Sequence, residues 1–293
     1  MAFPAGAQSP SASAISETDV TGMTVTLEAP ATNVVCLTGM CTDTLFVLGQ
    51  EPAAALDLLQ VRPLYWGAAG TSIPVIGGSF FEPSLEDIAA AKPDVVIGLA
   101  GVHDGVREGL VTIAPLFLVN PDGLDGMADQ VGQIGRLVGK GPAVETAVAD
   151  LEARIEADCG SIEDRRSTLV VFGSDTNVGV DIMRTPMIDA LARCADYAFT
   201  FEGGPHEYPT FSLEQLLAID PEVIFVETVG FGAEPPVDLT VQYAENPIWS
   251  ELQAVRNGDV HEVSFEIWGT TRGIHGVSSV LDEALPLLYP DAP

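Results

Sequence analysis

The segment SLEDIAAAKPDVVI, from Ser84 to Ile97, returns as SLEQLLAIDPEVIF from Ser212 to Phe225. The two copies start 128 residues apart and share six of their fourteen residues. In each copy a serine stands where a helix N-cap is expected, a proline ends the helix, and an apolar strand follows at once. Such a spacing is too long for a solenoid repeat and is typical of a duplicated lobe.

A long helical region separates the two copies. Residues 124–138 form one predicted helix that Gly139 ends, and Pro142 stands in the first turn of a second helix that runs to about Cys159. The second helix carries an apolar stripe at four-residue spacing and spans about 25 Å, at roughly 1.5 Å per residue. We therefore expect a rigid rod that connects two lobes.

Short apolar runs alternate with helical patterns along the chain. Residues 34–37 are typical of a buried strand, residues 42–48 of a helix, and Gly49 of its end. This alternation predicts an α/β fold of two Rossmann-like lobes, with mainly parallel sheets, a single long α-helix joining the lobes and a ligand cleft between them. The predicted organisation is a flexible leader (1–22), an N-terminal lobe (23–140), the linking backbone helix (141–166) and a C-terminal lobe (167–293).

The chain is strongly acidic. Its 293 residues include 42 Asp and Glu against 12 Lys and Arg, a formal net charge of −30. This charge excludes nucleic acid as a partner, because phosphate binding needs clustered Lys and Arg. No apolar run reaches the roughly 18 to 20 residues that a membrane-spanning helix needs. The acidity suggests adaptation to high salt, with an ordinary acidic protein as the alternative.

The four cysteines are Cys36, Cys41, Cys159 and Cys194, and no two of them form a C-x-x-C pair. No histidine stands at zinc-finger spacing from them, so a structural zinc site is not expected. Cys36 and Cys41 are close enough in sequence to form a disulfide. Buried free thiols are nevertheless the favoured interpretation.

Two lobes joined by one helix, each with an S-L-E-x-x-x-A-x-x-P-[DE]-V motif, resemble the helical-backbone class of solute-binding proteins of ABC importers. The stretch NPIWSELQAVRNGDV at 246–260 is similar to a segment of that family, and residues 280–290 resemble its last helix. The resemblance covers about residues 20 to 290. It implies export to the periplasm or the cell surface, with a lipid anchor on a removed N-terminal segment. The family includes receptors for ferric siderophores, haem and cobalamin.

The resemblance also implies that Glu86 and Glu214, which stand at the same place in the two copies, dock the protein to a permease dimer. A pair of exposed carboxylates on two rigid lobes suits a two-point electrostatic contact with arginines. The alternative is that each glutamate only stabilises the N-terminus of its own helix, by about 0.3 to 1 kcal/mol.

The ligand is expected outside the carboxyl ends of the strands, where loops of the two lobes face each other. Those loops carry aromatic side chains that suit a large flat ligand, and arginines that suit an anionic ferric chelate. The alternative for the aromatic residues is packing in the core. The alternative for the arginines is an ordinary salt bridge, which is favoured for Arg62. For His206 and His275 the alternative is simple exposure to solvent. The predicted ligand-binding residues are Met40, Tyr65, Trp66, Phe80, His103, Arg184, Tyr208, Phe231, Trp268 and Arg272.

Catalysis finds little support, because the sequence has no G-x-S-x-G elbow, no P-loop and no dinucleotide fingerprint. We expect no enzymatic activity, no resident cofactor and no protein-bound metal. The leading hypothesis is a monomeric solute-binding protein that captures an iron complex, with a ferric siderophore favoured, and delivers it to the permease.

Three alternatives stay open at this point. Haem or cobalamin capture is the alternative within the family, with Met40, Cys41, Tyr65 and His103 as possible axial ligands of haem. Several haem-binding relatives place a Tyr or Met ligand at the position of residues 77–81. This chain has neither there, which weakens the haem hypothesis. Alternatives of other classes are a nitrogenase-like metal-cluster scaffold and a surface interaction protein that has lost transport.

Overall fold

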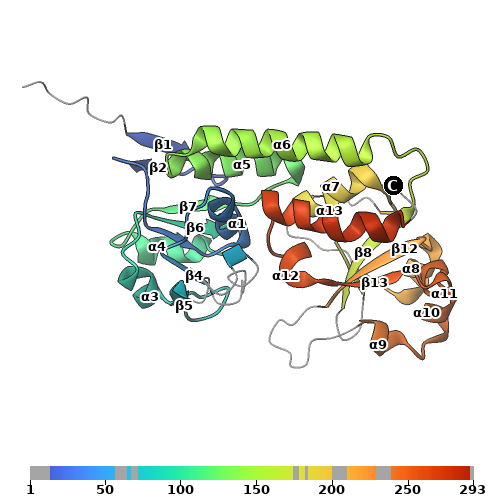
Figure 1. Cartoon of the computed structure of the whole chain (residues 1–293). Helices are drawn as coiled ribbons and strands as arrows, with labels where there is room; N and C mark the ends of the chain where they lie inside the picture. Colours follow the sequence, from blue (N-terminus) through green and yellow to red (C-terminus); the bar gives the residue numbers. More distant parts are fainter. Residues whose placement is uncertain are drawn as a thin grey trace, which may run out of the picture.

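Two α/β lobes lie at opposite ends of the molecule, and helix α6 (Gly141–Cys159) runs along both of them (Figure 1). The structure, a computed structural model, describes residues 14–56, 65–66, 72–173, 178–181, 184–199, 210–228 and 239–290. The predicted fold class is confirmed, because each lobe is built on a mainly parallel sheet and α6 carries the chain from one to the other.

The sheet of the N-terminal lobe has five strands, all parallel, in the order β5-β4-β3-β6-β7. Its central strands are buried on both faces, which explains why they read as continuous apolar runs. Helices α1 and α5 pack on one face of the sheet and α3 and α4 on the other. The elements are β3 (Val34–Cys36), α1 (Gly39–Val47), β4 (Ala54–Leu56), β5 (Val75–Ile76), α3 (Leu85–Ala90), β6 (Val95–Leu99), η3 (Asp104–Val106), α4 (Arg107–Leu110), β7 (Leu116–Val119) and α5 (Gly123–Leu137).

The sheet of the C-terminal lobe is mixed, in the order β11-β9-β8-β12-β13, with β10 also paired to β8. Strands β8, β10, β12 and β13 are parallel, while β9 and β11 add antiparallel pairings at one edge. The elements are β8 (Ser167–Gly173), β9 (Val178–Val180), α7 (Pro186–Cys194), β10 (Asp196–Tyr197), β11 (Thr210–Phe211), α8 (Leu213–Ile219), β12 (Val223–Thr228), α9 (Leu239–Tyr243), α10 (Pro247–Glu251), α11 (Gln253–Asn257), β13 (Val260–Ser264), α12 (Phe265–Trp268) and α13 (Ile274–Leu288).

The two copies of the repeated segment fold alike. Ser84 caps α3 and Ser212 caps α8, each by accepting a hydrogen bond from the backbone N–H three residues on. The residue before the proline adopts a left-handed conformation in both copies, with φ 49° at Lys92 and φ 46° at Asp220. The chain then enters β6 or β12, so the predicted helix, proline and strand are confirmed in both lobes.

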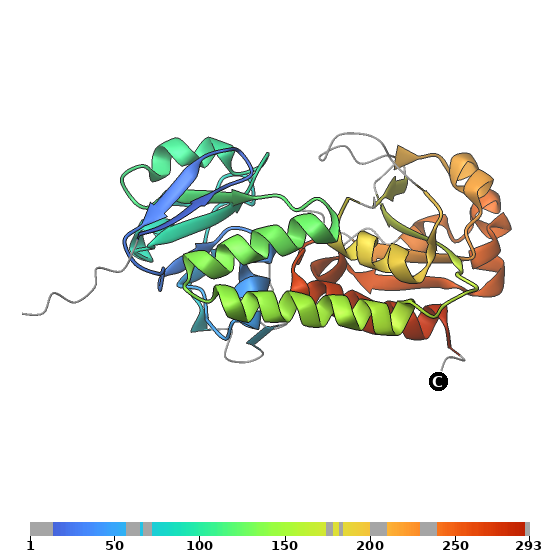
Figure 2. The same ribbon diagram turned by 90° about the horizontal axis from the view of Figure 1, so that it is seen from above.

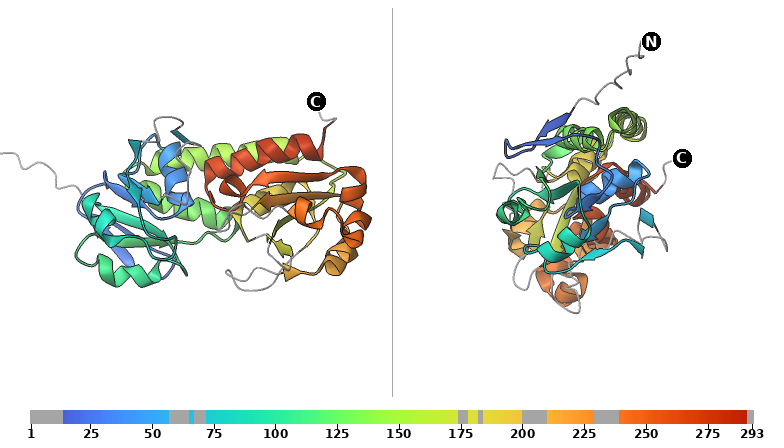
Figure 3. Two further views of the ribbon diagram at one scale, coloured as in Figure 1. Left: turned by 90° about the horizontal axis from the view of Figure 1, so that it is seen from below. Right: turned by 90° about the vertical axis from the view of Figure 1, so that its left-hand side faces the viewer.

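Helices α5 and α6 form an antiparallel pair along one side of the molecule (Figure 2). They approach closely at Gly135, where a Cβ atom would lie 2.7 Å from Cγ2 of Val144. Helix α13 lies alongside α6 (Figure 3), and Arg154 of α6 joins them by donating hydrogen bonds to Ser278 and Asp282. One buried apolar cluster therefore runs from the N-terminal sheet through these helices into the C-terminal lobe.

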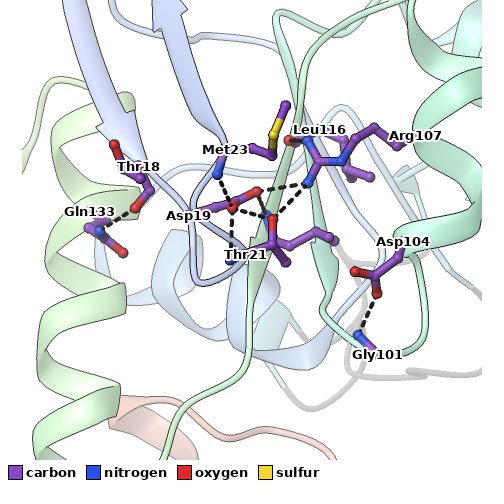
Figure 4. A network of polar contacts seen from close by, with 10 residues as sticks. Thr18, Asp19, Thr21, Met23, Gly101, Asp104, Arg107, Leu116 and Gln133 are labelled. Carbon is purple, nitrogen blue, oxygen red and sulfur yellow. Dashed lines mark hydrogen bonds and ion pairs between the residues drawn. The ribbon is translucent and has the colours of Figure 1, made fainter.

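The prediction of a flexible leader over residues 1–22 is wrong for the C-terminal part of that range. Residues 15–18 form strand β1 (Ile15–Thr18), which pairs with β2 (Thr24–Leu27) in an antiparallel hairpin. The buried carboxylate of Asp19 fixes the turn by accepting hydrogen bonds from the backbone of Met23 and from Arg107 (Figure 4). It also accepts one from the backbone N–H of Leu118. Arg107 lies far along the chain from Asp19, so the sequence near the start gives no sign of this anchor.

The expectation of free thiols is wrong. Cys36 and Cys41 form a disulfide, with a Cα–Cα distance of 5.5 Å, that ties the end of β3 to the first turn of α1. Cys159 and Cys194 form a second, with a Cα–Cα distance of 4.6 Å, that ties the end of α6 to the end of α7. The second pairing depends on helix packing, which cysteine spacing does not reveal. Across the described residues, no helix combines the length and the apolar character that a membrane span requires.

Candidate ligand-binding site and docking surface

The lobes meet where strands of both sheets end, which is where the sequence predicts the ligand. Helix α1 begins directly after β3, and at Gly39 a Cβ atom would lie 2.2 Å from the carbonyl oxygen of Thr270 in the C-terminal lobe. After β7, the backbone N–H of Gly123 donates a hydrogen bond to the carbonyl of Arg184, at 2.8 Å. Both contacts join the two lobes, and in each the residue of the N-terminal lobe follows the carboxyl end of a parallel strand.

An aromatic cluster lies at this junction and contains two of the predicted ligand-binding residues. The ring of Tyr65 packs against Phe46 at 4.9 Å, Trp66 at 5.7 Å and His275 at 5.2 Å between centroids. Tyr65 is buried, while Trp66 and His275 are half-buried. His275 was expected to be simply solvated, and that expectation is wrong, because the ring contacts come from the other lobe.

Asp43, a buried carboxylate in the middle of α1, was not among the predicted site residues. It accepts hydrogen bonds from the hydroxyl of Tyr65 and from the backbone N–H groups of His275 and Gly276, at 2.8, 3.0 and 2.8 Å. Burial raises the pKa of Asp43, while these hydrogen bonds and the charge of His275 oppose the rise. Asp43 is the only charged residue of α1, and this was the signal that could have singled it out.

Two of the predicted ligand-binding side chains belong to the core instead. Met40 is fully buried in the second position of α1, beside the disulfide. Trp268 is 1% exposed and stacks on Phe225 at 4.9 Å, and its indole N–H donates a hydrogen bond to Glu283 at 2.7 Å. Neither side chain has surface left for a ligand, because each fills an interior position of its lobe.

His103 is also buried, and both of its ring nitrogens are engaged. The backbone N–H of Leu99 donates to Nδ1 at 2.9 Å, so the proton is on Nε2, which donates to the carbonyl of Phe80 at 2.8 Å. Burial lowers the pKa of His103 and favours the neutral ring. His103 therefore anchors the loop of Phe80 and is not available as an axial ligand. Phe80 itself is half-buried, with its ring 5.4 Å from that of Phe81.

The predicted arginines occupy different surroundings. Arg184 forms an ion pair with Asp122 of the other lobe, at 2.5 Å, with both side chains partly exposed. Arg272 is half-buried, with a left-handed φ of 51°, beside Glu227 at the end of β12. Burial and the neighbouring Asp181 raise the pKa of Glu227 well above its usual range, and the charge of Arg272 opposes them.

Several predicted positions lie outside the described residues: Arg62, His206, Tyr208 and Phe231. The two glutamates of the repeated motif are described, and both are exposed in the first turn of a helix, Glu86 in α3 and Glu214 in α8. Hydrogen bonds from its own backbone N–H and from Ser212 lower the pKa of Glu214. Both side chains are therefore accessible to a macromolecular partner.

Comparison with known proteins gives a consistent result. A model of the periplasmic binding protein family matches residues 34–266. The ABC-transporter substrate-binding lipoprotein YhfQ of Bacillus subtilis is 27% identical over 258 residues, 82% of this chain and 78% of that one. The Fe(3+)-citrate-binding protein YfmC of the same organism is 26% identical over 222 residues, 72% of this chain and 66% of that one.

Solved structures with a similar fold include siderophore-binding proteins. The siderophore periplasmic binding protein from the fuscachelin gene cluster of Thermobifida fusca is 26% identical, with a TM-score of 0.66 over 89% of this chain and 98% of that one. The petrobactin-binding protein YclQ of Bacillus subtilis shares the fold with a TM-score of 0.78 over 94% of this chain and 99% of that one, at 18% identity. With its fold, its lobe junction and a family match over most of its length, the chain belongs to the periplasmic binding protein family.

Proposed function

We propose that this protein captures a ferric siderophore or ferric citrate outside the cytoplasm and delivers it to an ABC permease. The observation that carries the proposal is the junction of the two lobes, where the strand ends of both sheets converge beside half-buried aromatic rings and a half-buried arginine. Trp66 and Phe80 offer flat apolar contacts, and Arg272 offers positive charge to an anionic chelate. The relatives named for ferric citrate and siderophores bind ligands of this class.

Haem is a weaker candidate for the same site. Its four possible axial ligands are all engaged within the protein. Met40 is fully buried, and Cys41 is held in a disulfide. Both ring nitrogens of His103 are engaged, and the Tyr65 hydroxyl donates to Asp43. A metal-cluster scaffold is weaker again, because all four cysteines are held in disulfides and present no thiolate to a cluster.

The disulfides also support export, since such bonds persist in oxidising compartments and are rare in the cytosol.

Glu86 and Glu214 are proposed to dock the two lobes on a permease dimer through its arginines. The double variant Glu86→Ala/Glu214→Ala should then lose permease-dependent uptake and keep its ligand affinity. The matched control is Glu108→Ala/Glu251→Ala, which removes two other exposed glutamates and should leave uptake unchanged.

Tryptophan quenching tests the ligand assignment, because the chain has three tryptophans and two of them are buried. Ferric citrate and ferric hydroxamate or catecholate complexes should quench the emission of Trp66, while haemin and cobalamin should not. Trp66→Phe should remove most of the quenching, and Trp249→Phe, at a buried position, should preserve it. Arg272→Ala should weaken binding of the iron complex, whereas Arg256→Ala, at an exposed position, should not. Absence of quenching by every iron complex, at low and at multimolar salt, would contradict the proposal.

A further inference from the structure

Asp43 joins the two lobes through a helix N-terminus. It lies in α1, the first helix of the N-terminal lobe, and accepts hydrogen bonds from the second and third backbone N–H groups of α13, in the C-terminal lobe. These N–H groups have no partner inside their own helix, and a carboxylate placed there also interacts favourably with the helix dipole. Asp43 therefore caps the last helix of the other lobe.

Asp189 makes the reciprocal contact. It lies in α7, the helix that follows the first strands of the C-terminal lobe, and accepts a hydrogen bond from the backbone N–H of Leu124, at 2.9 Å. Leu124 is the second residue of α5, the helix that follows the last strand of the N-terminal lobe. Each lobe thus supplies an aspartate from its first helix to the N-terminus of the other lobe's last helix.

A glycine permits the close approach at each contact. A Cβ atom at Gly273, the N-cap of α13, would lie 2.3 Å from Cγ of Asp43. At Gly123, which has φ +67°, a Cβ atom would lie 2.8 Å from Oδ2 of Asp189. Any other residue at either position would push the aspartate away from the helix end, so both contacts are built for close packing.

The sequence carries a trace of this relation. Helices α1 and α7 begin with Thr38-Gly39-Met40 and Thr185-Pro186-Met187, and the aspartates follow five residues after Thr38 and four residues after Thr185. The 128-residue repeat does not cover these segments. Their equivalence appears only when the positions of the helices in the two lobes are compared.

We propose that Asp43 and Asp189 form a reciprocal pair of interlobe caps that fixes the orientation of the two lobes, with Asp43 as the dominant member. Asp43 is fully buried and has three donors from both lobes. The side chain of Asp189 is 21% exposed, has one backbone donor and faces Arg193 at 3.7 Å. On the proposed function, Asp43 is then a positioning residue that sets the geometry of the ligand site without contacting the ligand.

Spin labels on the two lobes test this directly, because an interlobe distance is measured without any ligand. Glu108→Cys and Ser250→Cys place labels at exposed positions of the N-terminal and C-terminal lobes, and the native cysteines are held in disulfides. The labelled parent should give one narrow distance distribution in electron–electron double resonance. Asp43→Asn should shift and broaden it, because an amide nitrogen facing three donors leaves at least one of them unpaired. Asp189→Asn should broaden it less.

Asp19→Asn is the matched control. Asp19 is also a buried carboxylate that accepts backbone hydrogen bonds, but all its partners lie in the N-terminal lobe. Its loss should lower the unfolding temperature and leave the interlobe distance unchanged. If Asp43→Asn does not fold, Tyr65→Phe removes one donor, keeps the carboxylate, and should still broaden the distribution. A folded Asp43→Asn or Tyr65→Phe variant with the parent distribution would overturn the proposal.

A ligand titration separates the two proposals. With ferric citrate as the probe, Asp43→Asn should lose affinity in proportion to the fraction of molecules that leave the parent orientation, while Asp19→Asn should not. If the parent protein does not bind ferric citrate, the proposed ligand assignment fails and the distance measurement still decides whether the caps hold the lobes.

Discussion

The two lobes share the repeated helix, proline and strand, yet they bury different titratable side chains at the carboxyl end of that strand. In the N-terminal lobe the end of β6 leads to the neutral imidazole of His103, which accepts from Leu99 and donates to Phe80. In the C-terminal lobe the end of β12 carries Glu227, a buried carboxyl beside Asp181. Duplication thus preserved the local scaffold, because it depends on short-range signals, while the interior at the strand ends diverged.

The largest expected difference between the lobes concerns their disulfides. In the chain-entropy description, closing a loop of 35 residues stabilises the fold by about 4 kcal/mol and closing one of 5 residues by about 2 kcal/mol. Cys159→Ser/Cys194→Ser should therefore lower the free energy of unfolding more than Cys36→Ser/Cys41→Ser does. Urea unfolding of both double variants measures this. Equal losses would show that the short disulfide has a further role at the lobe junction.

The next largest difference between the lobes should be in how their stability depends on pH. Burial lowers the pKa of His103 from 6.5, so the folded state binds fewer protons than the unfolded state and stability falls as the pH drops below about 6.5. His103→Asn, which does not titrate, should flatten this part of the curve. The measurement is the free energy of unfolding by urea between pH 4 and 8. An unchanged slope in the variant would assign the effect to other groups.

The C-terminal lobe should respond in the opposite direction. Burial raises the pKa of Glu227 from 4.5, so the folded state holds its proton longer and stability falls as the pH rises above 4.5 through the folded pKa. Glu227→Gln should therefore match the parent protein at pH 4 and exceed its stability at pH 7. A variant that is less stable at pH 7 would show that the charged carboxylate is needed beside Arg272.

The smallest expected difference concerns the helix caps. Ser84→Ala and Ser212→Ala should each cost about 1 kcal/mol of unfolding free energy. The loss should be larger for Ser212, because Gln215 accepts from its backbone N–H and completes a capping box. In the other copy, Asp87 instead accepts from Gly77. In a Gln215→Ala background, the loss caused by Ser212→Ala should therefore fall toward that of Ser84→Ala. Urea unfolding of the three single variants and of Ser212→Ala/Gln215→Ala tests this.

The fold was largely predictable, and the candidate site only in part. The repeated motif predicted α3, β6, α8 and β12, and Pro142 and Cys159 lie close to the ends of α6. Tyr65, Trp66, Phe80 and Arg272 were predicted in strand-end loops, and Tyr65 and Trp66 do lie at the lobe junction. Met40, His103 and Trp268 were misplaced, because a residue type in a loop or first turn does not reveal whether its side chain points inward.

The sequence by itself determined the order of the elements, the duplication, the acidity and the exposure of Glu86 and Glu214, because caps, proline stops and apolar periodicity act over a few residues. Only the tertiary structure decided the disulfide of Cys159 with Cys194 and the contact of Asp43 with α13. In that contact the paired residues are more than 230 positions apart in the chain. Such pairings depend on how helices from different lobes pack, and no local propensity encodes that packing.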